Sequence, residues 1–394
     1  MKRLLVIPII ILLSACTLKI GSTSTLPDNP APTAIPLSET AEPRLERREE
    51  APEKPIALPA GFEISVYADG LQAPRMMAVG LDGGVYVAER GAGRILRLVD
   101  GNEDGLLDQL DVVVEGLDSP SSLAFHQDGS LYVGETRRIL RLPASGEGGA
   151  FGEPQVVIDG LPSGGHNTRT VTFSPDYSSL YVSIGSSCNV CEEQDQRRAA
   201  IVRYNPDGSG ERVYARGLRN AVGITFNPGT GELWATNNGR DFLGDDLPPE
   251  TIYKIQEGAD YGWPGCHSGR IIDPDFGSQG SCEGIEQPQV EMQAHSAPLG
   301  LEFYSGDQFP AQYQGDLFVA FHGSWNRSQP VGYKVVRIPM DGDVIGLVED
   351  FAVGWLNNEA SWGRPVDIVT APDGSLLISD DAGGKIYRVY YRGP

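Results

Sequence analysis

Three common patterns are missing from this sequence. No glycine-rich fingerprint opens a βαβ unit, which argues against an NAD enzyme. No Gly-x-Ser-x-Gly motif stands between a strand and a helix, which argues against a serine hydrolase built on a nucleophile elbow. Long helical patterns are also absent, so a helical fold is not expected.

Basic residues are scarce relative to acidic ones. The chain has 31 Lys and Arg against 53 Asp and Glu, a formal net charge of −22. Nucleic acids and anionic membrane surfaces call for basic patches, so neither is an expected partner. The 394 residues, 40% of them hydrophobic, are enough for a large core and, by length alone, for roughly two or three domains.

The N-terminus resembles a bacterial lipoprotein signal. Lys2 and Arg3 precede the apolar residues 4–12, which are too few to span a membrane, and small residues precede Cys16. We therefore expect a signal peptide at 1–16, lipidation of Cys16, and a protein outside the cytoplasm whose only membrane contact is this lipid, in the periplasm or at the cell surface. An ordinary secretory signal is the alternative. Residues 17–57, rich in Pro, Ser, Thr and Glu, are interpreted as a disordered tether.

One pattern recurs six times from Leu58 onward: an apolar run, a turn mostly rich in Asp and Gly, and an alternating run typical of a β-hairpin. The copies are residues 77–87, 123–133, 171–182, 224–235, 301–319 and 368–378. A third alternating strand follows each copy, at residues 94–98, 138–142, 200–204, 251–255, 333–338 and 385–389. Six such units predict an all-β, six-bladed β-propeller over residues 58–394. A β-sandwich explains the alternation but not the sixfold recurrence.

Polar side chains stand just before the innermost strands of these units. In a propeller those strands start around one mouth of the central channel, so the side chains converge although they are far apart in sequence. They are Arg75, Ser121, Ser122, His166, Arg169, Arg219, Asn220, His295, Ser296 and Arg364. This locally basic rim suits an anionic ligand and stabilises negative charge that develops on a bound oxygen. His166 and Arg219 each lie seven residues before a phenylalanine, Phe173 or Phe226, which predicts equivalent places in two blades.

Six motifs, in their order along the chain, resemble those of the glucose/sorbosone dehydrogenases. They are Gly-Gly-His-Asn-Thr-Arg-Thr at 164–170, Ser-Cys-Asn-Val-Cys-Glu at 187–192, Gly-Leu-Arg-Asn at 217–220, Asn-Gly-Arg-Asp at 238–241 with Gly-Asp-Asp at 244–246, Asp-Tyr-Gly-Trp-Pro at 260–264, and His-Gly-Ser-Trp-Asn at 322–326. That family consists of extracytoplasmic six-bladed propellers that use pyrroloquinoline quinone (PQQ) with Ca²⁺. The resemblance covers about residues 58–391.

The resemblance implies a role for each matching residue. A sugar or sorbosone-like aldehyde would be oxidised, with hydride passing to the quinone and electrons to an external acceptor. His166 is the expected general base, the alternative being a structural histidine beneath a loop. Arg219 is expected to polarise the quinone oxygen. The expected cofactor contacts are Arg75, Arg169, Asn220, Asn238, Arg364 and Arg327, the last in place of a family lysine; carboxylates favour arginine because its geometry is planar and bidentate.

Two regions are candidate Ca²⁺ sites. By resemblance, the backbone carbonyls of Gly239 and Arg240 would hold the ion beside the quinone, and Asp245 and Asp246 could add carboxylate oxygens. Independently of the family, Asp100, Asn102, Asp104 and Asp108 alternate around a glycine like the first half of an EF-hand loop. This second stretch lacks the Glu of a complete loop and is equally compatible with an Asp/Gly turn between blades.

Two positions depart from the family pattern. The best-known glucose-oxidising members carry an Asp directly before the base, where Gly165 stands here, and a second cofactor arginine falls on Val366. We therefore expect the sequence to lie closer to the sorbosone-dehydrogenase branch.

The five cysteines suit an oxidising compartment. With Cys16 lipidated, Cys188, Cys191, Cys266 and Cys282 can form three pairings, of which Cys188–Cys191 with Cys266–Cys282 is the local one. A redox-active Cys-x-x-Cys is an alternative. Glu192 follows where c-type haem attachment needs His, and no second ligand pair for zinc is evident.

A non-redox propeller is the remaining alternative in function. It would be a Ca²⁺-dependent lactonase-like hydrolase or a carbohydrate-binding module. A lactonase needs carboxylate and amide groups around a Ca²⁺ at the channel centre, whereas the mouth predicted here is rich in Arg and His.

Overall fold

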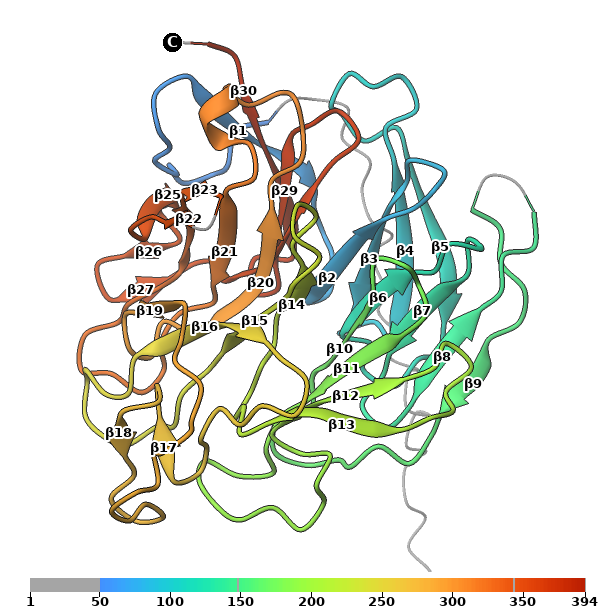
Figure 1. Cartoon of the computed structure of the whole chain (residues 1–394). Helices are drawn as coiled ribbons and strands as arrows, with labels where there is room; N and C mark the ends of the chain where they lie inside the picture. Colours follow the sequence, from blue (N-terminus) through green and yellow to red (C-terminus); the bar gives the residue numbers. More distant parts are fainter. Residues whose placement is uncertain (1–49, 147–148, 343, 394) are drawn as a thin grey trace, which may run out of the picture. The chain divides into compact units, whose positions relative to one another are not determined.

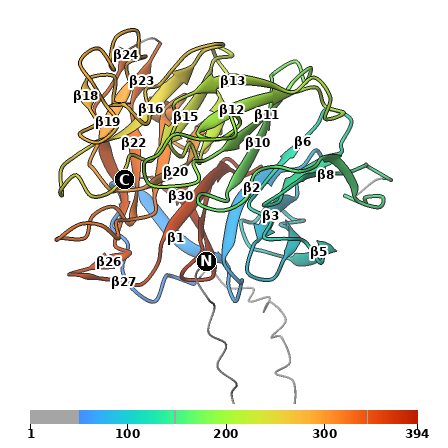
Figure 2. The ribbon, with the colours of Figure 1, turned by 90° about the horizontal axis from the view of Figure 1, so that it is seen from below.

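The computed structural model describes residues 50–146, 149–342 and 344–393. These form six four-stranded antiparallel sheets, which follow one another in chain order around a common centre (Figures 1 and 2). The innermost strands contact their neighbours in a closed ring, β2 to β6, β10, β14, β20, β28 and back to β2. The six-bladed β-propeller is therefore confirmed. The expected signal peptide with Cys16, and most of the tether, lie outside the described residues.

The first three blades are continuous in sequence. They consist of β2 (Pro74–Val79), β3 (Val85–Glu89), β4 (Arg94–Val99) and β5 (Gln109–Glu115); β6 (Ser122–Phe125), β7 (Leu131–Gly134), β8 (Ile139–Leu142) and β9 (Gln155–Ile158); and β10 (Arg169–Phe173), β11 (Leu180–Ile184), β12 (Ala200–Tyr204) and β13 (Arg212–Arg216).

Inserted hairpins lie within the fourth and fifth blades and before the sixth. The last three blades consist of β14 (Ile224–Phe226), β15 (Leu233–Asn237), β16 (Glu250–Ile255) and β19 (Val290–Met292); β20 (Pro298–Phe303), β21 (Leu317–Phe321), β22 (Lys334–Ile338) and β25 (Glu349–Val353); and β28 (Pro365–Thr370), β29 (Leu376–Asp380), β30 (Lys385–Tyr391) and β1 (Phe62–Ala68). Three small hairpins and one 3-10 turn are added: β17 (Cys266–His267) with β18 (Ile271–Ile272), β23 (Met340–Asp341) with β24 (Val344–Ile345), β26 (Leu356–Asn357) with β27 (Ala360–Ser361), and η1 (Ala311–Tyr313). No helix in the described part of the chain is long and apolar enough to cross a membrane.

The three strands predicted for every blade are present, but each blade has a fourth, outermost strand that the sequence pattern did not reveal. The outermost strands are largely exposed, for example β5 and β13, so their apolar alternation is weak. The second strands β3, β11, β21 and β29 are buried throughout, because each lies between two strands of its own sheet and between neighbouring blades.

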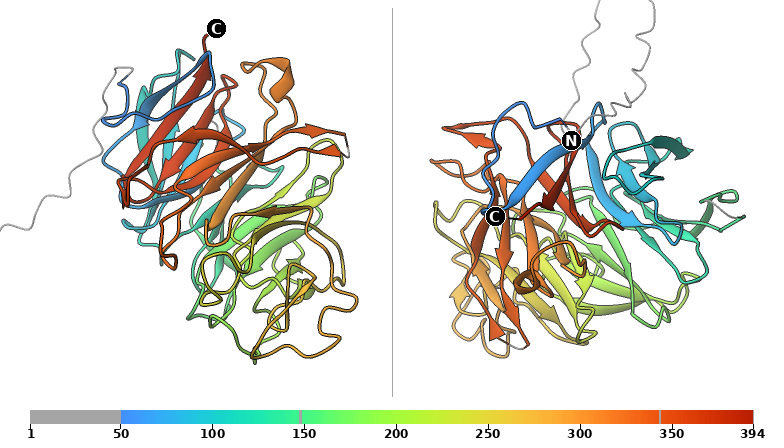
Figure 3. Two further views of the ribbon diagram at one scale, coloured as in Figure 1. Left: turned by 90° about the vertical axis from the view of Figure 1, so that its left-hand side faces the viewer. Right: turned by 90° about the horizontal axis from the view of Figure 1, so that it is seen from above.

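The ring is closed by the N-terminal strand. Strand β1 pairs with β30 from Phe62 with Tyr391 to Ala68 with Ile386, with a register shift between Val66 and Ala68. The last blade therefore contains both ends of the propeller (Figure 3). The Phe62 ring packs edge-on against four aromatic rings, with centroids 4.7–5.2 Å away. Residues 50–57, assigned above to the tether, also contact this region, since Glu50 bridges to Val66 and Ala57 to Val353. The contacts of the propeller thus begin before residue 58.

Candidate functional site

A cavity of about 290 Å³ lies at the end of the channel where the innermost strands begin. Its volume is close to the roughly 300 Å³ at which small-molecule pockets begin. The predicted rim residues Arg75, His166, Arg219, Asn220, His295 and Arg364 all line it, as do Thr168, Val222, Asn238, Gly239, Asp241, Glu250, Ala297, Leu299, His322, Gly323 and Trp325. The convergence expected from the six repeats is confirmed for these six positions.

A second set of lining residues comes from the opposite ends of the hairpins. In an antiparallel hairpin the second strand ends where the first begins, so residues that follow β15 and β21 reach the same mouth. Asn238 and Asp241 follow β15, and His322 and Trp325 follow β21. The sequence patterns indicated no role for Asp241, Glu250 or Asp381. The same hairpin geometry could have predicted Asp241, which follows β15, and Asp381, which follows β29.

The His166 ring is held from one side. Its Nδ1 lies 3.1 Å from the Ser186 carbonyl oxygen and 2.9 Å from Ser186 Oγ, and Ser186 Oγ donates in turn to the Cys188 carbonyl at 2.7 Å. Nε2 has no hydrogen-bond partner among the described residues. Burial, reinforced by the positive charge of Arg219, lowers the pKa of His166 to about 4. The imidazole is therefore neutral at physiological pH and suited to accept a proton.

Arg219 is a buried, oriented cation. Its Nε donates to the Asn189 carbonyl at 2.9 Å, and Nη2 donates to Asn189 Oδ1 and to Asp241 Oδ2, both at 2.9 Å. Burial lowers the pKa of Arg219, and the negative charge of Asp241 opposes that shift. The guanidinium stays charged, because an arginine pKa begins far above neutrality.

Arg75 belongs to a chain of charges on the far side of the cavity. Asp381 accepts from Arg75 Nη1 at 2.7 Å and contacts His322 Nε2 at 2.9 Å. Burial alone would raise the pKa of Asp381, but His322 and Arg75 together lower it to about 2. Burial lowers the pKa of His322. Arg75 Nε is buried without an acceptor among the described residues.

Arg364 is the lining arginine without a carboxylate partner in the described part of the chain. Its Nε and Nη2 donate to the carbonyls of His322 and Gly323, each at 3.0 Å, and its guanidinium lies 5.7 Å from the Tyr333 ring centroid. Two carbonyls orient the side chain without neutralising it. Arg364 can therefore form a salt bridge with an anionic ligand in the cavity.

Asn238, Gly239 and Glu250 form the wall between Arg219 and His295. Asn238 Nδ2 donates to the Pro298 carbonyl at 2.6 Å, and Gly239 N donates to Glu250 Oε2 at 2.7 Å. Burial raises the pKa of Glu250 to about 7, although the Gly239 N–H favours its charged form. Val366 stands where the family pattern has a second cofactor arginine. It is buried and packs with Met76, Val222 and Leu299 in a small apolar cluster next to this wall.

Several predicted residues do not line the cavity. The Arg169 guanidinium is fully buried and donates to the carbonyls of His166, Thr168 and Pro162, so it braces the loop before β10. Arg327 turns to the Asp245 carbonyl and to Asp246 Oδ1. Neither residue is among those that line the cavity, and their expected cofactor contacts stay predictions.

The acidic candidates for Ca²⁺ are also engaged elsewhere. Asp245 accepts from the Ser328 N–H and hydroxyl, and Asp246 pairs with Arg327, so both connect two loops outside the cavity. The Arg240 guanidinium pairs with Asp273 and Asp275, which leaves only its carbonyl for the expected role.

The Asp100 loop shows an internally bonded turn. Asp100 accepts from the N–H groups of Asp104 and Gly105, Asp104 from that of Leu106, and Asp108 from that of Gly101. Within the described ranges, Asp100, Asp104 and Asp108 are not among the groups of three His, Cys, Asp or Glu side chains close enough to share an ion. These bonds agree with the Asp/Gly turn, and a second Ca²⁺ site here stays a prediction.

The two disulfides are the local ones, Cys188–Cys191 and Cys266–Cys282. The first closes a four-residue loop between His166 and Arg219, and the second lies in the insertion of the fourth blade. Position 165, beside the loop that contains the Cys188–Cys191 disulfide, requires glycine. Gly165 has φ +64°, and a Cβ there would lie 2.4 Å from the Ser187 carbonyl oxygen and 2.6 Å from that of Ser186. In this chain, the absence of Asp before the base therefore has a steric cause, the backbone of Ser186 and Ser187.

Comparison with known proteins agrees with this geometry. A sequence profile of the glucose/sorbosone dehydrogenase family matches residues 71–388. The chain belongs to this family. The pyrroloquinoline quinone-dependent pyranose dehydrogenase of Coprinopsis cinerea is 25% identical over 407 aligned positions, which cover 84% of this chain and 54% of the relative. The chain thus spans about half the length of that curated family relative.

Two solved structures share the fold. The calcium structure of the family AA12 carbohydrate-active enzyme of Trichoderma reesei superposes with a TM-score of 0.75 at 20% identity, covering 87% of this chain and 99% of the other. The holo form of the PQQ domain of the Coprinopsis cinerea pyranose dehydrogenase gives a TM-score of 0.73 at 23% identity, covering 86% and 98%. At these identities the likeness concerns the propeller fold of the family.

Proposed function

We propose that this protein is a PQQ-dependent dehydrogenase that oxidises a sugar or a sorbosone-like aldehyde and passes the electrons to an external acceptor. The observation that carries the proposal is the cavity itself. It combines three oriented guanidinium groups with a neutral imidazole whose Nε2 has no hydrogen-bond partner in the described part of the chain. The PQQ-dependent relative supports the same cofactor, and the family profile supports a sugar or sorbosone dehydrogenase.

The donor set fits PQQ, a planar quinone that carries three carboxylates. Arg364 has no carboxylate partner among the described residues, and Arg75 lines the same cavity. Arginine at these two positions can bind carboxylates in the plane of the ligand. The Gly239 carbonyl at the cavity wall and that of the adjacent Arg240 would be the oxygen ligands for Ca²⁺.

Each residue has one task in the proposed reaction. When bound, PQQ supplies an electrophilic carbonyl that takes up the hydride of the substrate. His166 Nε2 accepts the hydroxyl proton of the sugar hemiacetal or of the aldehyde hydrate, since its neutral form prevails at physiological pH. Arg219 places a fixed positive charge beside the developing negative charge, and Asn189 and Asp241 prevent it from turning away.

The substrate class is supported by an aromatic edge at the cavity mouth. Trp325 lines the cavity and is 69% exposed, and Phe242 on the neighbouring loop is 66% exposed. Their rings meet edge to face with centroids 5.7 Å apart, and beneath them Asn326 Nδ2 donates to Asp241 at 3.2 Å. Two such rings offer an apolar surface to the C–H face of a sugar, which we propose as the substrate contact.

The lactonase-like alternative finds less support. Asp241 is occupied by Arg219 and Glu250 by the Gly239 N–H. Within residues 50–393 as described, the group of three potential metal-binding side chains is Cys188, Cys191 and Glu193, whose cysteines are disulfide-bonded. The described residues therefore provide no cluster of three such side chains for a Ca²⁺ held by carboxylates at the channel centre.

The decisive experiment loads the purified protein with PQQ and Ca²⁺ and screens aldoses and sorbosone-like aldehydes with an artificial electron acceptor. We expect turnover that requires both additions. His166→Gln should bind PQQ as tightly as the natural protein and lose turnover. Equal activity in His166→Gln would remove this residue as the base, and absence of quinone binding with any divalent ion would refute the dehydrogenase.

We also propose that the protein is lipid-anchored outside the cytoplasm through Cys16. The N-terminal pattern supports it, and the two disulfides suit an oxidising compartment. Cys16→Ala should move the protein from the membrane fraction to the soluble fraction. An unchanged membrane fraction would contradict the anchor.

A further inference from the structure

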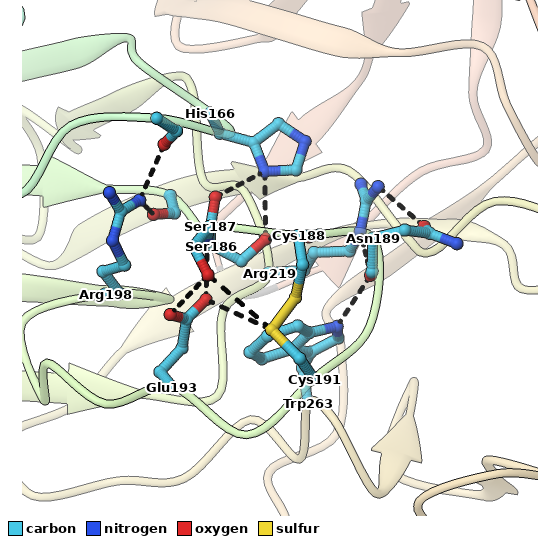
Figure 4. Close-up of a disulfide and its surroundings, with 12 residues drawn as sticks. His166, Ser186, Ser187, Cys188, Asn189, Cys191, Glu193, Arg198, Arg219 and Trp263 are labelled. Carbon is cyan, nitrogen blue, oxygen red and sulfur yellow. Dashed lines mark hydrogen bonds between the residues drawn. A yellow bond between two sulfur atoms is a disulfide. The ribbon is translucent and has the colours of Figure 1, made fainter. Parts of the chain in front are cut away.

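We infer that the disulfide loop at residues 186–191 is a positioning element that fixes the tautomer of His166 and the orientation of Arg219 together. Ser186 and Asn189 are its positioning residues. The roles of His166 and Arg219 rest on the proposed function, but the tautomer and the orientation are properties of the protein without cofactor. Figure 4 draws the loop with His166, Arg219 and Trp263 around it.

The hydrogen bonds around Ser186 define the proton on the His166 ring. The Ser186 carbonyl can only accept, and the Ser186 hydroxyl gives its proton to the Cys188 carbonyl. Both contacts of Nδ1 are therefore with acceptors, so Nδ1 carries the proton in the neutral ring. Nε2 is left with the lone pair, which is the form that a base requires.

The same loop holds Arg219 through Asn189. The Asn189 carbonyl and Oδ1 accept from two different nitrogens of the guanidinium, and Oδ1 also accepts from the Asp241 N–H at 2.8 Å. Asn189 Nδ2 donates to the Asp241 carbonyl at 3.0 Å. One side chain thus aligns the arginine with its counter-ion, and Trp263 Nε1 adds a bond to the Asn189 carbonyl at 3.3 Å.

Backbone and covalent bonds keep both halves of the loop in register. Ser186 N donates to the Arg219 carbonyl at 2.8 Å, while the His166 N–H donates to the Ser186 carbonyl at 2.9 Å. The disulfide closes the chain immediately around Asn189, between Cys188 and Cys191. A shift of this loop must therefore displace the His166 partner and the Arg219 partner at once.

Two adjacent glycines provide a matched test of this inference. Both have positive φ, +89° at Gly164 and +64° at Gly165, so alanine is strained at either position. A Cβ at Gly164 meets nothing within 4 Å, whereas one at Gly165 collides with the backbone of Ser186 and Ser187. Comparison of the two variants Gly164→Ala and Gly165→Ala therefore separates the effect of displacing the loop from the backbone strain that both variants share.

The first measurement uses the protein without cofactor. The ¹⁵N shifts of the His166 ring, assigned by comparison with His166→Gln, should show a protonated Nδ1 in the natural protein and in Gly164→Ala. Gly165→Ala and the double variant Cys188→Ala/Cys191→Ala should show a mixture of tautomers. A single Nδ1–H form in both of these variants would overturn the inference, whatever the protein proves to catalyse.

The second measurement uses the loaded enzyme. Gly165→Ala, the double cysteine variant and Asn189→Ala should lower kcat by up to about 100-fold, the effect of misplaced reacting groups, with KM nearly unchanged. Gly164→Ala should stay within a few-fold of the natural protein. Equal kcat in all four variants would overturn the inference. If the loaded natural protein shows no activity, the proposed function is refuted, but the tautomer result remains valid.

Discussion

The pH dependence of His166 gives the sharpest prediction for the proposed chemistry. Burial and the charge of Arg219 place its pKa at about 4 rather than at the ordinary 6.5. At pH 5 roughly 90% of the imidazole is then neutral, against roughly 3% for an unperturbed histidine. The two cases differ about 30-fold in the fraction of active base at that pH.

The assay is kcat/KM of the loaded enzyme from pH 3.5 to pH 8, because this ratio reports the groups of the free enzyme. We expect activity to persist down to pH 5 and to fall as the pH passes through about 4. Arg219→Met should raise the pKa only in part, because burial is the larger cause of its depression. An acid limb centred near 6.5 would refute the assignment of a buried, arginine-flanked base.

Loss of structure at low pH must be separated from titration of the base. The folded-state pKa of His166 lies below its unfolded value, so the unfolded chain binds the proton first as the pH falls. The free energy of unfolding therefore decreases from pH 6.5 toward pH 4. Circular dichroism at each pH identifies the range in which the fold persists, and an NMR titration of the His166 ring gives the pKa without turnover.

Three further changes test other parts of the account. Arg364→Leu removes a guanidinium that has no carboxylate partner among the described residues, and should raise the Kd for PQQ by about 10- to 100-fold; Arg216→Leu, on a pair with Asp260 at the surface, should leave it unchanged. Trp325→Ala should raise KM for the sugar several-fold with little change in kcat, and an unchanged KM would remove the aromatic edge from the substrate site. Phe62→Ala should lower the free energy of unfolding by about 3–5 kcal/mol, because the Phe62 ring packs in the core where β1 closes the propeller. Chemical denaturation measures this change, and a smaller loss would show that β1 contributes little to stability.

The sequence predicted the architecture because the repeat is expressed in buried strands. Three strands of every blade carry apolar alternation, and their copies align at the Asp/Gly turns. The outermost strands did not show the pattern because they are exposed, and β1 was missed because its partner β30 lies at the other end of the chain.

The location of the candidate site could be predicted from the sequence, but the side chains that face the cavity could be predicted only in part. Strand order placed His166, Arg219 and Arg364 at one mouth, and the structure brings them together. The sequence does not show the direction of a side chain. Arg169 and Arg327 start near the mouth, but local carbonyls and carboxylates bind their guanidinium groups away from the cavity. In the sequence, Gly165 is a position where the Asp of other family members is missing. The structure explains the glycine, because the neighbouring disulfide loop leaves no room for a side chain.

Binding of PQQ to the purified protein in the presence of Ca²⁺ tests the central claim most directly. Isothermal titration should give saturable, stoichiometric binding that is weakened in Arg364→Leu and retained in His166→Gln. Such a result would establish that the cavity of Arg75, Arg219 and Arg364 is a quinone site. Absence of binding in the natural protein, or equal binding in Arg364→Leu, would contradict the account.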